Sequence, residues 1–165
     1  MEWRLGGTKD SRNTRYGYIS LDMVTTMIIE NYTVDFEVAG PGLYEITEEL
    51  NRRLKALNVE SGLMTLFIKH TSASLLIQEN ADPSAKRDLE AWLNRLVPES
   101  EALYSHITEG PDDMPAHIKA MLTAVNLSIP ISKRTLVLGT WQGVFLWEHR
   151  RATNQRQIAL NVVGR

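Results

Sequence analysis

Four histidines are the side chains of this sequence best suited to bind a metal ion or to transfer protons near neutral pH. They are His70, His106, His117 and His149, and each lies in a polar segment beside hydroxyl or carboxylate residues. The chain contains no cysteine, so a bound Zn, Mg or Mn ion would need imidazole or oxygen ligands. No pair of histidines has the spacing of a metal motif, so spacing alone leaves ligation, acid–base chemistry and structural roles open.

Carboxylates accompany two of these histidines. Glu109, Asp112 and Asp113 lie between His106 and His117, and Asp113 precedes His117 by four residues, so these two can share one face of a helix. Carboxylates in such a position ligate a metal ion, orient an imidazole or act as a general base. The alternative is that Asp112 or Asp113 only caps the helix that follows.

Charge and composition exclude several classes of partner. The net charge of −2 and the pI of about 6.1 indicate no broad basic surface, so we expect no nucleic-acid partner. The short basic cluster Glu148–Arg151, with Arg156 close behind, fits either a solvated surface or a site for one anion. No stretch approaches the roughly 20 apolar residues of a membrane-spanning helix, so we expect no membrane partner. Residues 1–22 lack the apolar core of a secretory signal, which favours a cytoplasmic location.

The segments that position these residues alternate between the periods of strands and helices. Strand-like patterns cover residues 24–38, 63–70, 71–79, 127–131, 135–140, 144–150 and 157–163. Helical spacing runs from Leu43 to Leu57, from Asp82-Pro83 to Pro98, and from Asp112 to Val125, with a loop over residues 98–110.

Short turns between the late strands favour antiparallel pairing, because a parallel partner needs a long crossover. The order of elements therefore predicts an α+β sandwich with helices on a mostly antiparallel sheet. We expect a single domain over residues 23–165, preceded by an N-terminal extension of residues 1–22. The segment Gly139–Gly143 is interpreted as a structural hairpin, with a ligand-binding loop as the alternative.

Four blocks of this sequence resemble the signature blocks of the YjbQ family, in the same order and from about Met23 to the C-terminus. They are His70-Thr71-Ser72-Ala73-Ser74, Glu79-Asn80-Ala81-Asp82-Pro83, the run from Glu109 to Lys119, and Gly139-Thr140-Trp141-Gln142-Gly143. The resemblance implies a sandwich of about seven mostly antiparallel strands with two to three helices. It also implies a homotrimer with a histidine-lined, metal-associated pocket near the subunit interface.

The family is often labelled secondary thiamine-phosphate synthase, which implies joining a hydroxymethylpyrimidine diphosphate to a thiazole phosphate. On this hypothesis a divalent ion, Zn, Mg or Mn, is held by three histidines: His106, His117 and His149. The catalytic or orienting residues are His70, Glu79, Asp113 and Glu148. The groups that hold the phosphorylated small-molecule substrate are Thr71, Ser72, Ser74, Lys119 and Arg150. Any of the four histidines can exchange roles in this hypothesis.

Two other functions stay open for the same residues. The first is metal-dependent hydrolysis of a phosphoester or another small molecule. The second is a non-catalytic trimer that binds a small anion.

Overall fold

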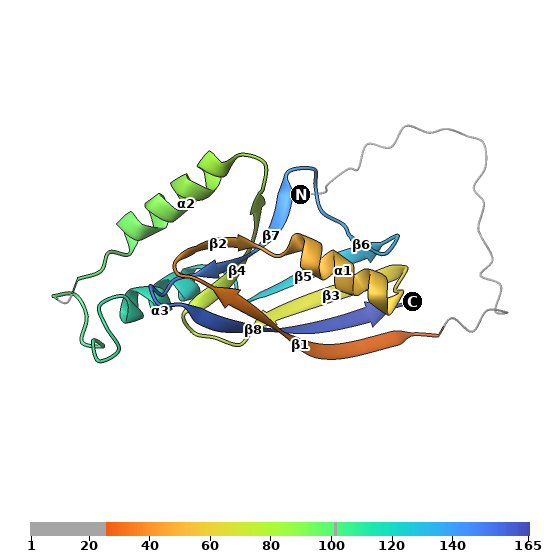
Figure 1. Cartoon of the computed structure of the whole chain (residues 1–165), viewed down its shortest axis with the longest axis horizontal. Coiled ribbons are helices and arrows are strands. Elements are labelled where there is room, and N and C mark those ends of the chain that lie inside the picture. The colour runs from red at the N-terminus through yellow and green to blue at the C-terminus, as the bar shows by residue number, and fades with distance from the viewer. Residues whose placement is uncertain (1–25, 101) are drawn as a thin grey trace, which may run out of the picture.

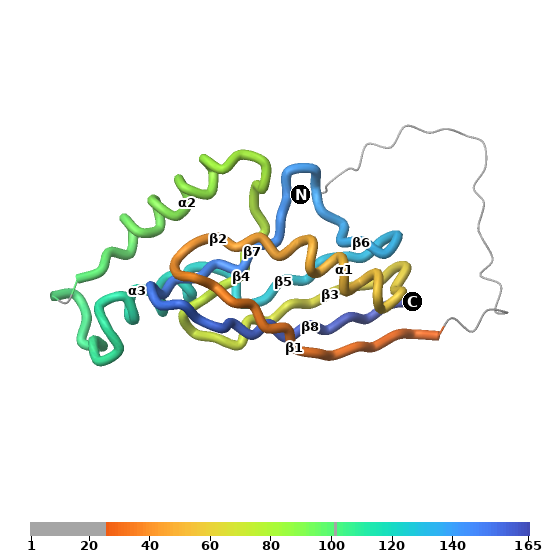
Figure 2. Tube along the Cα trace, viewed as in Figure 1, coloured from red at the N-terminus to blue at the C-terminus, as the bar shows by residue number. Residues whose placement is uncertain are grey.

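The structure is a computed structural model that describes residues 26–100 and 102–165. These residues form eight strands and three helices, and Figures 1 and 2 show how the elements are arranged. The elements are β1 (Ile28–Val38), β2 (Gly42–Glu45), α1 (Thr47–Leu57), β3 (Ser61–Ile68), β4 (Ala73–Glu79), α2 (Pro83–Leu96), α3 (Asp113–Leu122), β5 (Asn126–Ser132), β6 (Thr135–Leu136), β7 (Gln142–Glu148) and β8 (Asn154–Gly164). The predicted N-terminal extension lies outside the described residues.

The strands form two sheets, and every named pair is antiparallel. The larger sheet has the order β1-β8-β3-β5-β6, and the smaller has the order β2-β7-β4. The predicted α+β class with mostly antiparallel strands is therefore confirmed. Of the last four strands only β5 and β6 pair with each other, because β7 joins the smaller sheet and β8 returns to the larger. Within the segment Gly139–Gly143, residues 139–141 therefore connect the two sheets, while Gln142 and Gly143 begin β7 and pair with β4, so the interpretation as a hairpin was wrong.

One hydrophobic core joins both sheets and α1. It contains Leu50 and Leu54 of α1, Val144 and Leu146 of β7, and alternate residues of β8. The predicted start of α1 at Leu43 was wrong, because residues 42–45 pair with β7 and the helix begins at Thr47. In a short segment, backbone pairing to a neighbouring strand outweighs a helical spacing of apolar residues.

The other two helices lie near the end of the smaller sheet that carries Ala73 of β4 and Glu148 of β7. Asp82 caps α2 by accepting a 2.7 Å hydrogen bond from Ser84 N, as the Asp-Pro pair predicts. Only Leu93 of α2 is buried, and Figure 1 shows α2 extending away from the sheets. No helix in the described ranges is long and apolar enough to span a membrane.

Candidate functional site

The end of β7 sends neighbouring side chains to opposite sides of the smaller sheet, because side chains of a strand alternate. Val144 and Leu146 belong to the main core, whereas Trp147 belongs to a second cluster with Leu93 of α2. Glu148 follows the first set, and His149 lies beside Trp147 with 5.4 Å between ring centroids. The consecutive residues Glu148 and His149 therefore point to opposite sides of the smaller sheet, Glu148 toward the main core and His149 toward the second cluster.

Glu148 forms a buried, bidentate ion pair with Arg156 of β8. Arg156 Nε donates to Oε2 at 2.5 Å and Nη2 donates to Oε1 at 2.6 Å. Oε1 also accepts the backbone N–H groups of His149 and Arg150. Both carboxylate oxygens of Glu148 thus accept hydrogen bonds, and this carboxylate fixes the turn from β7 toward β8.

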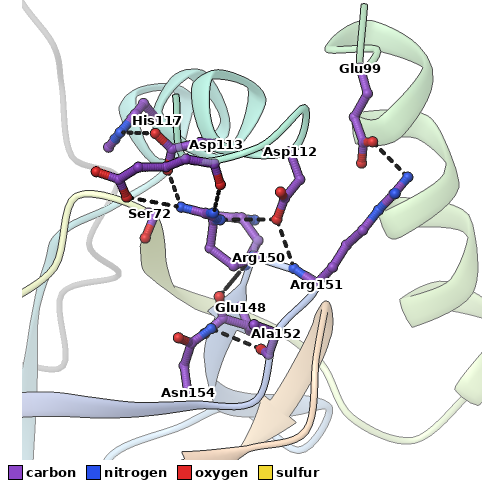
Figure 3. A network of polar contacts seen from close by, with 12 residues as sticks. Ser72, Glu99, Asp112, Asp113, His117, Glu148, Arg150, Arg151, Ala152 and Asn154 are labelled. Carbon is purple, nitrogen blue, oxygen red and sulfur yellow. Dashed lines mark hydrogen bonds and ion pairs between the residues drawn. The ribbon is translucent and has the colours of Figure 1, made fainter. Parts of the chain in front are cut away.

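A second cluster gathers around Arg150, as Figure 3 shows. Its guanidinium donates to Asp112 Oδ2 at 2.9 Å, to Asp113 Oδ1 and to the carbonyl oxygen of Glu109 at 2.8 Å. Asp112 Oδ2 also accepts the backbone N–H of Arg151. Burial alone would raise the pKa of Asp112, but these donors outweigh it and hold the pKa below its ordinary value.

These contacts show that the alternative role of Asp112 or Asp113, capping the helix that follows, was wrong. Asp112 occupies the position before α3, yet its side chain makes no capping hydrogen bond. Both carboxylates instead bind Arg150, which is more than thirty residues away in the chain. The donors of Arg150 are consequently engaged by protein oxygens rather than directed at a phosphate.

The structure brings His106, Asp113 and His117 together. Asp113 Oδ2 lies 2.7 Å from Nε2 of His106 and 3.4 Å from Nε2 of His117. The side chain of Asp113 is only 2% exposed, whereas that of His106 is 50% exposed, so the group opens to solvent on one side. In the described part of the chain this is the group of three or more His, Asp or Glu side chains close enough to hold a metal ion.

The hydrogen bonding of this group is incomplete in a way that fits a metal ion. Nδ1 of His117 lies 3.0 Å from the carbonyl oxygen of Thr71, which can only accept, so Nδ1 carries the proton. A neutral His117 therefore directs the lone pair of Nε2 toward Asp113. Oδ2 of Asp113 is buried and makes no hydrogen bond, although Nε2 of His106 lies only 2.7 Å from it. Two imidazole nitrogens and an unpaired carboxylate oxygen form a ligand set that suits Zn or Mn.

A cavity of about 860 Å³ adjoins His117. Residues of β3 and α3 give it apolar walls, and the segment after β3 adds polar groups. Its lining is Phe67, Ile68, Lys69, His70, Thr71, Ser72, His117, Ala120, Met121 and Val125.

His70 lines this cavity with both ring nitrogens already approached by donors. Nε2 accepts the backbone N–H of Gln157 at 2.8 Å, and Nδ1 faces Arg156 Nη1 at 3.3 Å. Burial lowers the pKa of His70, and the charge of Arg156 lowers it further. Arg156 Nη2 also donates to Oγ of nearby Ser72 at 3.2 Å. His70 and Ser72 thus hold the segment that presents the Thr71 carbonyl group to His117.

His149 and Lys119 lie away from this group, on the other side of α3. His149 Nε2 contacts Ser74 Oγ at 2.9 Å, and Lys119 Nζ donates to Asn94 Oδ1 at 2.7 Å. Burial lowers the pKa of His149 to about 3, with Lys119 and Arg156 acting in the same direction. Asp113 therefore occupies the position that the sequence hypothesis gave to His149.

Glu79 lies far from the other predicted site residues. It ends β4, whereas Ser74 lies near the start of that strand, so about 17 Å of extended chain separates them. Glu79 lines a different cavity with Ala81, Asp82 and Trp141. The structure therefore does not bring Glu79 to the histidines within this chain.

Comparison with known proteins gives this architecture a family. The model of the family described as UPF0047 protein YjbQ-like matches residues 32–165. The chain belongs to this family. It is 49% identical over 125 residues to the UPF0047 protein sll1880 of Synechocystis sp., covering 76% of this chain and 85% of that protein. It is 44% identical to UPF0047 protein YjbQ of Salmonella typhimurium, covering 80% and 96%.

A solved structure of a relative has the same fold. The conserved hypothetical protein TT1486 of Thermus thermophilus is 35% identical and superposes with a TM-score of 0.68. The match covers 78% of this chain and 98% of that protein.

Arg156 has a role in this YjbQ-like chain that its place in a short basic cluster does not predict, because it is the buried partner of Glu148. Its signal lies in the alternation of β8, where Arg156, Ile158 and Leu160 are all buried. A charged residue in the apolar phase of a strand predicts a buried ion pair. The same test applied to β7 identifies Glu148 as its partner.

Proposed function

We propose that the protein is a divalent-metal-dependent enzyme that acts on a phosphorylated small molecule. The observation that carries this proposal is the buried oxygen Oδ2 of Asp113, which has no hydrogen-bond donor and lies 2.7 and 3.4 Å from two imidazole nitrogens. A metal ion would provide the positive charge that Oδ2 of Asp113 and the free Nε2 of His117 need, with Nε2 of His106 close enough to join them.

The surrounding residues prepare the three ligands. Arg150 binds Oδ1 of Asp113 and leaves Oδ2 directed at the histidines. The carbonyl group of Thr71 fixes the tautomer of His117, so that Nε2 is the free nitrogen. The bound ion would polarise a phosphoryl oxygen and stabilise a departing diphosphate.

The reaction that we propose first is thiamine-phosphate synthase-like: an alkyl transfer from a pyrimidine diphosphate to a thiazole phosphate with release of diphosphate. The cavity beside His117 supports it, because apolar walls from Phe67, Met121 and Val125 suit heteroaromatic rings. Thr71 and Lys69 of its lining supply a hydroxyl and an ammonium group for the phosphates.

A second candidate is metal-assisted hydrolysis of a phosphoester. It is favoured by the half-exposed His106, because that side of the ligand group admits water. We also propose that the protein is a cytoplasmic homotrimer. Large exposed apolar side chains beside the cavity, including Phe67, Met121 and Leu122, support burial against a second copy.

The first experiment measures the ligand set by metal analysis and Zn²⁺ titration of purified variants. We expect His106→Ala and His117→Ala to lose the metal, and His149→Ala, the matched control, to retain it. Retention of metal by both His106→Ala and His117→Ala would exclude the proposed site.

A second experiment tests the reaction. The metal-loaded protein is incubated with both thiamine precursors, and separately with a panel of phosphoesters. Thiamine phosphate formed only by the protein with intact ligands supports the transfer, whereas release of phosphate supports hydrolysis. If both assays are silent, the anion-binding alternative gains support. Light scattering tests the trimer, and cell fractionation tests the location.

A further inference from the structure

A second polar cavity lies on the side of α3 opposite the metal-ligand group. It encloses about 530 Å³ and is lined by Pro41, Asn94, Val97, Pro98, Glu99, Lys119, His149 and Arg151. His117 and Lys119 are two residues apart on α3, about 200° around the helix, so they face different cavities. No residue of this lining belongs to the group of His106, Asp113 and His117.

Lys119 is a buried cation with an incomplete set of partners. The residue is 7% exposed, and Nζ donates to the neutral side chain of Asn94 at 2.7 Å. Among the described residues, no carboxylate lies within ion-pair distance of Nζ. Burial lowers the pKa of Lys119, Glu99 and Asp112 raise it only from farther away, and Glu99 is paired with Arg151. An ammonium group has three N–H donors, and an unpaired buried charge is energetically costly. The cavity beside Lys119 therefore has a place for an anion.

His149 adds a neutral polar group to the same cavity. Its Nε2 is engaged by Ser74 Oγ at 2.9 Å. Its Nδ1 has no partner in the described part of the chain, and it is not among the unpartnered atoms that are sealed from solvent. The ring is neutral because burial, followed by the charges of Lys119 and Arg156, lowers its pKa to about 3. Nδ1–H therefore donates when Nε2 accepts from the hydroxyl group of Ser74.

The charges of the lining select the kind of anion. Lys119 and Arg151 carry two positive charges and Glu99 carries one negative charge, so the lining has a net charge of +1. Arg151 Nη2 and Glu99 Oε2 pair at 2.6 Å at the rim (Figure 3). A singly charged oxyanion balances this sum, whereas a phosphate dianion leaves an excess negative charge. Pro41, Val97 and Pro98 offer apolar surface to a carbon skeleton.

We propose that this cavity binds the carboxylate group of a small organic acid, with Lys119 as its counter-ion and Asn94 and His149 as hydrogen-bond partners. Asn94 accepts from Lys119 through Oδ1, which leaves its amide N–H groups as donors for the carboxylate. This site does not depend on the proposed metal chemistry, so it is tested in the presence of a chelator.

The test is an NMR titration of the ¹⁵N-labelled full-length protein at pH 7 and constant ionic strength. Acetate, pyruvate and benzoate are the monocarboxylate probes, and sulfate, which is doubly charged at pH 7, is the dianion probe. We expect saturable shifts of the amide signals of Asn94, Lys119 and His149 with at least one monocarboxylate. Lys119→Met should weaken that affinity at least about tenfold, because it removes a charge-assisted bond. Lys55→Met, an exposed lysine on α1, is the matched control and should bind like wild type.

Three results would overturn the proposal: no saturable shift with any monocarboxylate, a stronger response to sulfate, or an undiminished response in Lys119→Met. If Lys119→Met does not fold, Lys119→Gln keeps a neutral donor for Asn94 and replaces it in the same titration. Binding by Lys119→Gln at wild-type affinity would equally refute Lys119 as the counter-ion.

Discussion

Two arginine–carboxylate clusters adjoin the end of β7, and they differ in how completely the carboxylate oxygens are bonded. Glu148 and Arg156 form a closed cluster, because Oε1 accepts three donors and Oε2 accepts Arg156 Nε. Arg150 and Asp113 form an open cluster, because Oδ1 is bonded and Oδ2 is not. Both carboxylates are buried, so burial alone does not separate them.

The difference distinguishes a structural role from a functional one. Removing one partner of a closed cluster lowers the unfolding free energy of the protein, because the other partner is left buried without its hydrogen bonds and counter-ion. An open cluster retains an unsatisfied atom that the fold holds at some cost, and such atoms are typical of ligand sites. Variants of the two clusters should therefore affect different measurements.

The largest effect is expected for Glu148→Gln. The change leaves Arg156 as a buried cation without its counter-ion, and we expect a loss of about 3–5 kcal/mol in unfolding free energy. Urea denaturation measures it. Glu60→Gln is the control, because it breaks an exposed pair with Arg134 and should cost at most about 1 kcal/mol. Similar losses in the two variants would contradict the closed cluster.

Asp113→Asn should mainly affect metal binding. Replacing the anionic ligand by an amide should weaken Zn²⁺ affinity about 100-fold or more. This exceeds the loss of about 10–100-fold that is typical when a residue supporting a metal ligand is replaced. Its unfolding free energy without metal should change much less than that of Glu148→Gln, because Oδ2 makes no hydrogen bond to lose. Calorimetric titration compares it with Asp88→Asn, an exposed position on α2. Equal Zn²⁺ affinities in the two variants would refute the open cluster as a metal site.

The unfolding free energy should fall in acid because of His149, whose side chain lies on the side of the smaller sheet opposite that of Glu148. Burial lowers its pKa from 6.5 to about 3, so between these values the unfolded chain binds a proton that the folded chain does not. The contribution of neutral His149 is therefore complete above pH 6.5 and is lost as the pH falls toward 3. Between pH 7 and pH 5 the loss should be about 2 kcal/mol. His149→Gln should lack this slope in urea denaturation at both pH values, and parallel slopes would count against a buried neutral ring.

The smallest effect is expected for Asp112→Asn, which weakens the support of Arg150 without removing a metal ligand. We expect a cost of about 1 kcal/mol at pH 7, from weaker bonds to Arg150 and Arg151. The pKa of Asp112 is below its ordinary 3.8, so this contribution is present above that value and is lost as the pH falls through the folded pKa. Unfolding at pH 6 and pH 3 checks this, and a constant difference would contradict it.

Much of the fold and part of the site were predictable from local patterns. Alternation in β1 and β8, the Asp-Pro start of α2, and the four-residue spacing of Asp113 and His117 all depend on neighbours in the chain. Local patterns did not predict β2 as a strand, because its four residues are fixed by pairing with β7. They also did not predict that β7 and β8 lie in different sheets.

The sequence by itself determined which side chains can do chemistry and which face of each strand or helix they share, because these follow from residue type and backbone period. Only the tertiary structure decided which faces meet. It joined His106 to Asp113 and His117, and it placed His149 beside Ser74 and Trp147 instead. The physical reason is that side chains next to each other on a strand point to opposite sides, and the partners on each side come from distant segments whose pairing no local spacing encodes.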